Sequence, residues 1–346
     1  MKKFSLMMAV VLALSLVMTA CAPAAPSKPD CSQANVFCVG LVTDVGKVND
    51  KSFNQTAWEG VQQAEKELGA TVQYIETSDA KDYAKNIDTF ALAKYKVIVT
   101  VGFNLGEATT AAAKKYPDIK FIGVDQDQSA GAVANLAGLV FPEDQAGFLV
   151  GALAAQMTKS KKIGAICGTD AVPPVWRYGE GYKAGAKYID PTVEVNVIYH
   201  SDVGFDKTFA DPEWGKTTAL SMIDKGVDVI FGAGGNTGNG GVQGAASKGV
   251  YAIGVDTDQY FTLPDAQKML LSSAMKLETP GVFALLKLAK DGKLPSGNYL
   301  GTAGYAPYHD LDSQVPAAVK AKMEQIAKDI TSGALKTGVA PAKPAN

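Results

Sequence analysis

Two segments of the chain repeat one arrangement of polar residues that suits the recognition of a small polar molecule. In each segment an apolar run leads through a short Gly- and Asn-containing loop to a second apolar run that ends in Asp. The repeated positions are Asn104 with Asp125, and Asn236 with Asp256. Asn offers a donor and an acceptor, whereas an ionised Asp accepts hydrogen bonds. If two halves of the chain face each other, the four side chains converge on one cleft; as isolated residues, they have the types found in helix caps and turns.

The residues that common enzyme mechanisms need are sparse. The chain has only two histidines, His200 and His309, so neither His-based catalysis nor a His-rich metal site is expected. Gly215-Lys216-Thr217 resembles the end of a phosphate-binding loop, but Ala210 stands where that motif requires its first Gly. The motifs G-x-S-x-G and H-E-x-x-H are absent. We therefore expect a protein that binds a ligand without a cofactor or metal and does no chemistry on it.

Length and composition bound the architecture. The chain has 346 residues, of which 47% are hydrophobic and 20% are charged, the balance of a globular protein. A chain of this length favours more than one domain. The formal net charge is −2, and no basic patch is large enough to suggest nucleic acid binding.

The polar positions follow strands in a regular alternation of strands and helices. The run 37–42 predicts a buried strand, 43–51 a polar loop, and 52–68 a helix with Asp50 or Ser52 as its N-cap. Similar strand–helix units continue along the chain, which predicts α/β architecture with parallel sheets and helices on both faces. In such sheets ligands bind beyond the carboxyl ends of the strands. Phe53 begins the first helix there, either to contact a ligand or to anchor the helix to the sheet.

Four stretches together resemble the basic membrane protein family. The first is Thr43-Asp44-x-Gly-x-x-Asn-Asp-Lys-Ser-Phe-Asn-Gln. The likeness continues through Gly234-Gly-Asn-Thr-Gly-Asn-Gly and Ile253-Gly-Val-Asp-Thr-Asp-Gln to Leu271-Ser-Ser-Ala-Met-Lys276. Members of this family are lipoprotein substrate-binding components of ABC importers, and the characterised members bind purine nucleosides. The resemblance implies a type I periplasmic binding fold, with two doubly wound lobes joined by a hinge, and it covers nearly all of the mature chain.

The resemblance also implies which residues hold the ligand. Phe53 and Phe209 match the two family aromatics that stack on a base, although Phe205 competes with Phe209 because the preceding stretch is long. Asp125 matches a group that accepts from the base edge, with Asn104 beside it. The ribose hydroxyls would be held by Asp44, Asp256 and Lys276.

Some of these residues also have purely structural explanations. Phe209 suits a core position before a helix, and Lys276 suits a solvated position beside one. The Gly-rich stretch that includes Gly234 lets the backbone approach a ligand. Trp176 and Arg177 either line the rim of the cleft or only pack.

The amino terminus has the features of a lipoprotein signal peptide. Lys2 and Lys3 precede the apolar run 4–17, and small residues then lead to Cys21, which resembles a lipidation site. An ordinary secretory peptide is the alternative. We expect cleavage after residue 20, a lipid on Cys21, a tether over 21–35, and an extracytoplasmic position at the cell membrane.

The remaining cysteines agree with export. Cys31 and Cys38 bracket a short segment before the first strand, where a disulfide would pin the incoming chain in an oxidising exterior. A metal-binding pair is the alternative, but no second ligand pair lies nearby. Cys167 lies in an apolar strand pattern, so we expect an inert buried thiol.

The sequence therefore predicts a lipid-anchored receptor of two lobes. We place 36–141 and 257–293 in the first lobe, and 142–256 and 294–340 in the second. The expected partners are a purine nucleoside (guanosine, inosine or adenosine) and the permease and ATPase subunits of an ABC importer, and we expect a monomer. A pentose or nucleobase in the same fold is the alternative.

Overall fold

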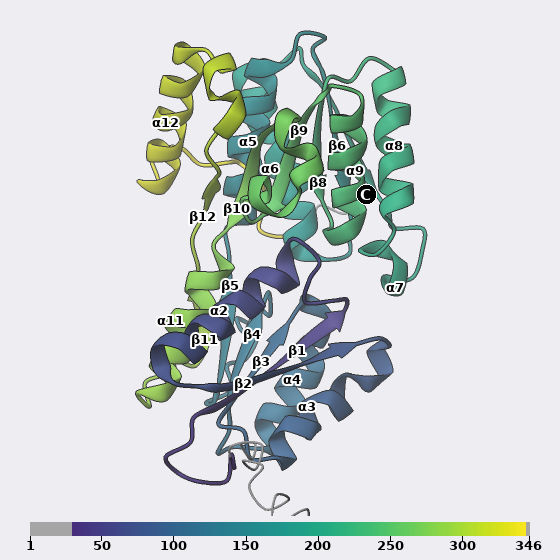
Figure 1. Cartoon of the computed structure of the whole chain (residues 1–346). Coiled ribbons are helices and arrows are strands. Elements are labelled where there is room, and N and C mark those ends of the chain that lie inside the picture. The colour runs from purple at the N-terminus through teal and green to yellow at the C-terminus, as the bar shows by residue number, and fades with distance from the viewer. Residues whose placement is uncertain (1–29, 344–346) are drawn as a thin grey trace, which may run out of the picture.

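The computed structural model describes residues 30–343, which form two α/β lobes stacked end to end (Figure 1). The predicted class of two doubly wound lobes is confirmed. The predicted signal peptide and Cys21 lie outside the described residues. Among residues 30–343, no helix has both the length and the apolar character needed to cross a membrane.

The first lobe is built on a six-stranded parallel sheet in the order β11-β5-β4-β3-β1-β2. Its strands are β1 (Cys38–Val45), β2 (Thr71–Thr77), β3 (Val97–Val101), β4 (Lys120–Val124), β5 (Leu136–Val140) and β11 (Gly297–Leu300). All five residues of β3 are buried, as expected for a central strand covered on both faces. The covering helices are α2 (Phe53–Leu68), α3 (Tyr83–Leu92), α4 (Gly106–Lys115) and α11 (Glu278–Lys290).

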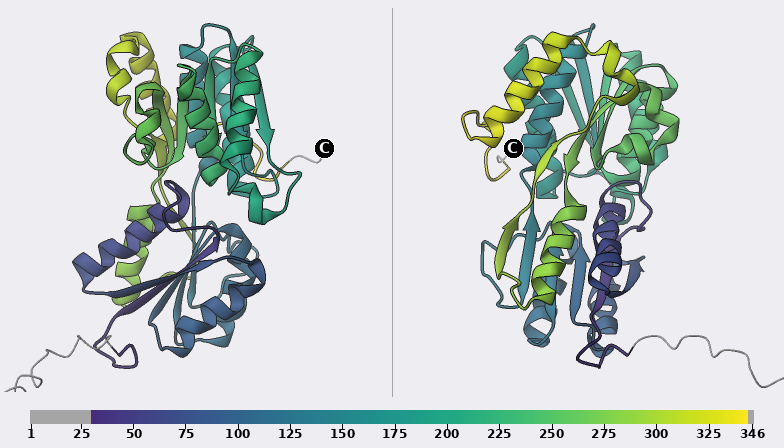
Figure 2. Two further views of the ribbon diagram at one scale, coloured as in Figure 1. Left: turned by 45° about the vertical axis from the view of Figure 1, so that its right-hand side comes forward. Right: turned by 60° about the vertical axis from the view of Figure 1, so that its left-hand side comes forward.

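The second lobe repeats this plan with the order β12-β10-β9-β8-β6-β7. Its strands are β6 (Lys162–Cys167), β7 (Glu194–Tyr199), β8 (Val229–Ala233), β9 (Tyr251–Asp256), β10 (Leu270–Lys276) and β12 (Ala303–Tyr305). Its helices are α5 (Glu143–Met157), α6 (Pro173–Ile189), α7 (Phe205–Thr208), α8 (Pro212–Asp224), α9 (Gly235–Ser247), α10 (Gln259–Thr262) and α12 (Ala317–Thr331). The last helix lies on the outer side of this lobe (Figure 2), so this part of the segment 294–340 is in the second lobe as expected.

The two orders match strand for strand, so the lobes are related by an internal repeat. In this correspondence β1 matches β6, β3 matches β8, and β4 matches β9. The one difference in direction is at the edge, where β11 runs parallel to β5 but β12 runs antiparallel to β10. The carboxyl ends of all these strands except β12 face the junction between the lobes (Figure 1).

Three short crossovers form the hinge, and hydrogen bonds join them to one another. They lie between β5 and α5, between β10 and α11, and between β11 and β12. Gly301 N donates to Val140 O at 2.8 Å, and Leu277 N donates to Thr302 O at 2.9 Å. A Cβ at Gly301 would lie 2.3 Å from the ring of Phe141, so only Gly lets these two crossovers approach so closely.

The crossover positions differ from the predicted lobe boundaries. We expected 257–293 in the first lobe, but β10 pairs in parallel with β9 in the second sheet. We also expected 294–340 wholly in the second lobe, but β11 pairs with β5 in the first. An apolar strand fits the edge of either sheet, and its partner is chosen by long-range packing that the local pattern does not encode. The chain therefore crosses at Leu277 and returns at residues 301–302.

Local boundaries follow the sequence closely, with two differences near the junction. β1 continues to Val45, through residues expected in a loop, because it pairs with β2 as far as Thr77. The Gly-rich stretch after Gly234, whose backbone we expected to approach a ligand, is helical from Gly235. Both differences lengthen a regular element toward the junction.

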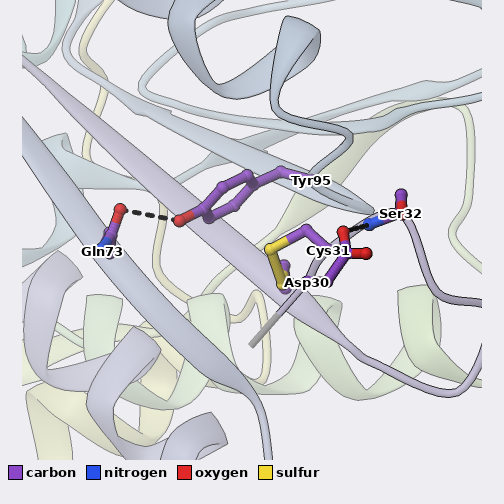
Figure 3. Close-up of a disulfide and its surroundings, with 6 residues drawn as sticks. Asp30, Cys31, Ser32, Gln73 and Tyr95 are labelled. Atoms are coloured by element: carbon purple, nitrogen blue, oxygen red, sulfur yellow. Dashed lines mark hydrogen bonds between the residues drawn. A yellow bond between two sulfur atoms is a disulfide. The ribbon is translucent and has the colours of Figure 1, made fainter. Parts of the chain in front are cut away.

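Cys31 and Cys38 form a disulfide, which confirms the predicted pair (Figure 3). The bridge pins the chain that enters the lobe to the start of β1. Nearby, Ser32 N donates to Asp30 Oδ1, and Tyr95 donates to Gln73, which fixes the surrounding edge of the sheet (Figure 3). The expected tether reached residue 35, whereas the structure fixes the chain from Cys31, which is buried. Cys167 is a buried thiol whose pKa burial raises to about 12, so it is inert as expected.

Candidate functional site

A cavity lies between the two lobes, lined from both sides. Its unfilled space is about 880 Å³, part of which is open to solvent. The structure brings all eight residues proposed from the sequence to this one cavity: Asp44, Phe53, Asn104, Asp125, Phe209, Gly234, Asp256 and Lys276. Asn236, the counterpart of Asn104 in the repeat, also lines it.

The end of β1 contributes Asp44 to the wall of the first lobe. Gly102 lies so close that a Cβ there would be 2.4 Å from Asp44 Oδ2, and its φ of 112° also requires Gly. Asn54 Nδ2 donates to Asp44 Oδ1 at 3.4 Å. Burial raises the pKa of Asp44 to about 7, and the nearby carboxylates of Asp50 and Asp125 add to this shift, while the Asn54 hydrogen bond opposes it.

The start of α2 is fixed by Asp50. Its carboxylate accepts from the backbone N–H groups of Ser52 at 2.9 Å, Asn54 at 2.9 Å and Gln55 at 3.1 Å. Of the two predicted caps, Asp50 therefore satisfies the free N–H groups, while the Ser52 side chain makes no cap bond. Burial raises the pKa of Asp50 to about 6, although these three N–H groups favour its ionised form. This cap fixes Phe53 at the N-terminus of α2.

Asp125, directly after β4, and Asp256, at the end of the matched strand β9, have the same unusual backbone conformation. Their φ angles are 59° and 64°, in the left-handed region that residues other than Gly rarely adopt. Such backbone strain is concentrated at functional sites. Both side chains are more than nine-tenths buried. The repeat that the sequence revealed is therefore also a repeat of backbone geometry.

Lys276 ends β10 and lies at the centre of a buried charge cluster. Its ammonium donates to Asp125 Oδ2 at 2.6 Å and lies 3.5 Å from Glu278 Oε1. Burial lowers the pKa of Lys276, but Asp125 and the carboxylates around it outweigh burial and raise it above the ordinary value. The side chain is 2% exposed, so it is not the solvated lysine that the sequence left open.

Asp256 makes different contacts. Its carboxylate accepts from Ser52 Oγ of the first lobe at 2.6 Å and from the Tyr178 hydroxyl at 3.5 Å. Burial raises the pKa of Asp256, and Lys276 and the Ser52 hydrogen bond oppose that shift. This carboxylate therefore joins the two lobes through a hydroxyl, not through a cation.

The two aromatic residues proposed from the sequence, one from each lobe, line the cavity. The Phe53 ring centroid is 4.6 Å from Lys276 Nζ, a cation–π distance. Phe209 packs against Gly168, where a Cβ would be 2.2 Å from its ring. Phe205, the competing aromatic, is 44% exposed and does not line the cavity, so the structure places Phe209 there instead.

Backbone carbonyls next to Phe53 are held directly by the second lobe. Asn239 Nδ2 donates to Asp50 O at 2.8 Å. The carbonyl of Lys51 accepts from Gln259 Nε2 at 3.1 Å and from Thr262 Oγ1 at 2.8 Å. These contacts hold the lobes together beside the cavity.

Sequence reasoning missed several lining residues. Pro174 and Tyr178 lie four residues apart on one face of α6 and line the cavity, a spacing that could have identified them. Phe103, between Gly102 and Asn104, also lines it. Trp176 is buried outside the cavity, and Arg177 pairs with Glu143 at 3.5 Å, so neither lines it.

The arrangement is suited to binding. Within residues 30–343, no group of three His, Cys, Asp or Glu residues is placed to hold a metal ion. His200 stacks on Trp214 at 4.0 Å, His309 pairs with Asp258 at 2.7 Å, and neither histidine lines the cavity. What lines it is a set of hydrogen-bonding groups and aromatic rings.

Comparison with known proteins places this arrangement in a family. The chain is 34% identical over 279 residues to the ABC transporter nucleoside-binding protein BmpA of Lactococcus lactis subsp. cremoris, covering 74% of this chain and 76% of that protein. An uncharacterised lipoprotein of Pyrococcus abyssi is 31% identical over 317 residues, covering 87% and 76%.

Solved structures agree on the fold. The crystal structure of an ABC transporter solute-binding protein from Aeropyrum pernix K1 matches with a TM-score of 0.77 at 25% identity, covering 87% of this chain and 92% of that one. The sequence model of PnrA-like ABC transporter substrate-binding proteins matches residues 37–302. The chain belongs to the Bmp family of PnrA-like ABC transporter substrate-binding proteins.

Proposed function

We propose that this protein is a lipid-anchored receptor that captures purine nucleosides between its lobes and delivers them to an ABC permease. The observation that carries the proposal is a cavity that combines a phenyl ring from each lobe with several buried carboxylates and a lysine. A nucleoside is a flat aromatic base joined to a ribose whose hydroxyls donate hydrogen bonds, and these side-chain types complement both parts.

The two rings suit the base. Phe53 and Phe209 come from opposite lobes, so closure of the lobes would bring a ring to each face of a base. Each such stack contributes about 0.5–1.5 kcal/mol beyond the area that it buries. A free sugar has no aromatic face and would gain less from this arrangement.

The charged groups suit the remaining polar atoms. Asp44, Asp125 and Asp256 are acceptors, and Lys276 is a donor. Hydrogen bonds that involve a charged group contribute about 1.5–3 kcal/mol each. A few of these with two stacks are enough for micromolar affinity, about −8 kcal/mol, after the costs of association.

Closure would couple capture to delivery. A ligand that contacts both lobes favours the closed arrangement in proportion to the contacts that it makes only there. The permease and its ATPase subunits would then accept the closed receptor. The relative named as a lipoprotein supports a lipid on Cys21 that keeps the receptor at the extracytoplasmic face of the membrane.

Calorimetric titration of the ligand-stripped protein from Cys31 onward tests this function. Inosine, guanosine and adenosine should bind tightly and saturably, ribose should be silent, and chromatography should recover each nucleoside unchanged. Binding of a pentose or a free nucleobase in their place would assign the cavity to another small polar ligand. Release of a free base from inosine would contradict the receptor role.

A further inference from the structure

Glu278 is a fully buried carboxyl group at the middle crossover of the hinge. It begins α11 immediately after the chain leaves the second lobe, and its side chain is 0% exposed. Its Oε2 lies 2.6 Å from the hydroxyl of Thr56 on α2. Thr56 is one helical turn beyond Phe53, and Thr279 Oγ1 donates to Thr56 O at 2.8 Å. Glu278 therefore links α2, the helix that carries Phe53, to the start of α11, two residues after Lys276.

The hydrogen bonds around Thr56 indicate where a proton lies. Its hydroxyl has one hydrogen but lies near three acceptors: Ser52 O at 3.0 Å, Phe53 O at 3.0 Å and Glu278 Oε2 at 2.6 Å. A Thr inside a helix commonly donates to a carbonyl of the preceding turn. The short contact with Glu278 is then satisfied when the carboxyl group itself donates to Thr56.

The other oxygen of Glu278 has the surroundings of a neutral group. Oε1 is buried without a hydrogen-bond partner among the described residues. Its distance of 3.5 Å from Lys276 Nζ exceeds the usual length of a charge-assisted hydrogen bond, about 2.7–2.9 Å. Lys276 instead makes its short contact, 2.6 Å, with Asp125.

The cation nearest to Glu278 is already paired with another carboxylate. Lys276 at the end of β10, Asp125 after β4, Asp256 at the end of β9 and Tyr178 on α6 act on Glu278 directly. Glu143 on α5, which pairs with Arg177 on α6, belongs to the same cluster. Counting Glu278, four carboxyl groups share two cations. Burial raises the pKa of Glu278 well above its ordinary value, against the opposing effect of Lys276.

We propose that Glu278 is a positioning residue of the ligand site and acts as a neutral carboxylic acid. It donates to Thr56, which fixes the first turn of α2 behind Phe53, and it leaves Lys276 to Asp125. Its ionisation at high pH removes that donor, competes for Lys276 and repels the nearby aspartates. The consequence for affinity rests on the proposed nucleoside function, whereas the protonation state does not.

The protonation state can be read without a ligand. Infrared spectra of the wild-type protein from Cys31 onward and of Glu278→Gln are compared near neutral pH, with the exposed Glu107→Gln as matched control. We expect the difference spectrum of Glu278→Gln to contain the carbonyl stretch of a protonated carboxylic acid. The control should lose carboxylate bands only. A carboxylate band in the Glu278→Gln difference would overturn the proposal.

The positioning role is read from inosine affinity near neutral pH. Glu278→Gln, which stays neutral and can still donate to Thr56, should keep the wild-type affinity within about threefold. Glu278→Ala, which removes the donor, should lose at least tenfold. Glu278→Gln as weak as Glu278→Ala would overturn the role of a neutral donor, and wild-type affinity in Glu278→Ala would overturn the positioning role. Wild-type protein that binds no nucleoside would count against the proposed function and leave the infrared result to decide on Glu278.

Discussion

The two lobes place an aspartate on matched strands with the same backbone conformation, yet they give it different partners. Asp125 of the first lobe pairs with Lys276, which belongs to the second. Asp256 of the second lobe accepts from Ser52, which belongs to the first. Each aspartate thus reaches across the junction, one to a buried cation and the other to a hydroxyl. The internal repeat accounts for the shared backbone geometry of the two aspartates. The partner on the other lobe determines how strongly each aspartate depends on contact between the lobes.

The largest difference should follow from removing each aspartate. Asp125→Ala leaves Lys276 buried with its short ion pair broken, which costs about 3–5 kcal/mol of stability. Nucleoside affinity should fall by at least tenfold while circular dichroism remains that of the folded protein. Asp256→Ala leaves only hydroxyl donors without their partner, which costs about 1–3 kcal/mol. It should therefore reduce both the stability and the nucleoside affinity less than Asp125→Ala does. Titration calorimetry and thermal unfolding of both variants measure these losses. A larger loss of affinity or stability in Asp256→Ala would contradict the predicted order.

The aromatic pair should respond more evenly than the aspartates. Phe53→Ala and Phe209→Ala each remove one stacking face, so each should weaken inosine, guanosine and adenosine alike, by about threefold to thirtyfold once lost burial is included. The exposed Phe205→Ala serves as the control and should leave affinity unchanged. Selective loss of one nucleoside in either variant would argue for a role other than stacking.

The asparagines should show a smaller effect. Asn104 and Asn236 line the cavity at matched positions and are neutral, so each hydrogen bond with a ligand contributes about 0.5–1.5 kcal/mol. Asn104→Ala and Asn236→Ala should each cost about twofold to tenfold in affinity. A hundredfold loss in only one of them, measured in the same titrations, would show that the repeat does not extend to ligand binding.

Asp44 has no counterpart in the second lobe, where β6 ends next to Gly168, and it should have only a small effect on the stability of the ligand-free protein. Its pKa is about 7 in the fold and 3.8 ordinarily, so the folded state holds a proton that the unfolded chain releases. The stability from this group is present below about pH 4 and is lost as pH rises through about 7. Since Asp44 is half-buried, we expect its contribution to the melting temperature to be a few degrees at most.

Thermal unfolding of ligand-free wild type and Asp44→Asn over this pH range checks the prediction. The variant should show a shallower decline in melting temperature as pH rises, because Asn does not titrate. Parallel curves for the two proteins would mean that Asp44 is ionised in the fold at neutral pH.

Much of the fold and the site could be predicted because it depends on local sequence. The apolar run 37–42 located β1, and the helix expected over 52–68 is observed as α2 (Phe53–Leu68). The repeated Asn and Asp positions came from the same local patterns, and the resemblance supplied Phe53, Phe209, Asp44 and Lys276. Whether these residues contact a nucleoside stays a prediction.

Tertiary structure decided what depends on partners far apart in the chain. The sequence could not assign β10 to the second sheet, because an apolar strand can pair with either sheet and long-range packing decides between them. Nor could it reveal that Glu278 meets Thr56, 222 residues away, or that Lys276 meets Asp125, 151 residues away. A local pattern shows that a side chain is polar. Its protonation and partner depend on the burial and charges that only the assembled junction provides.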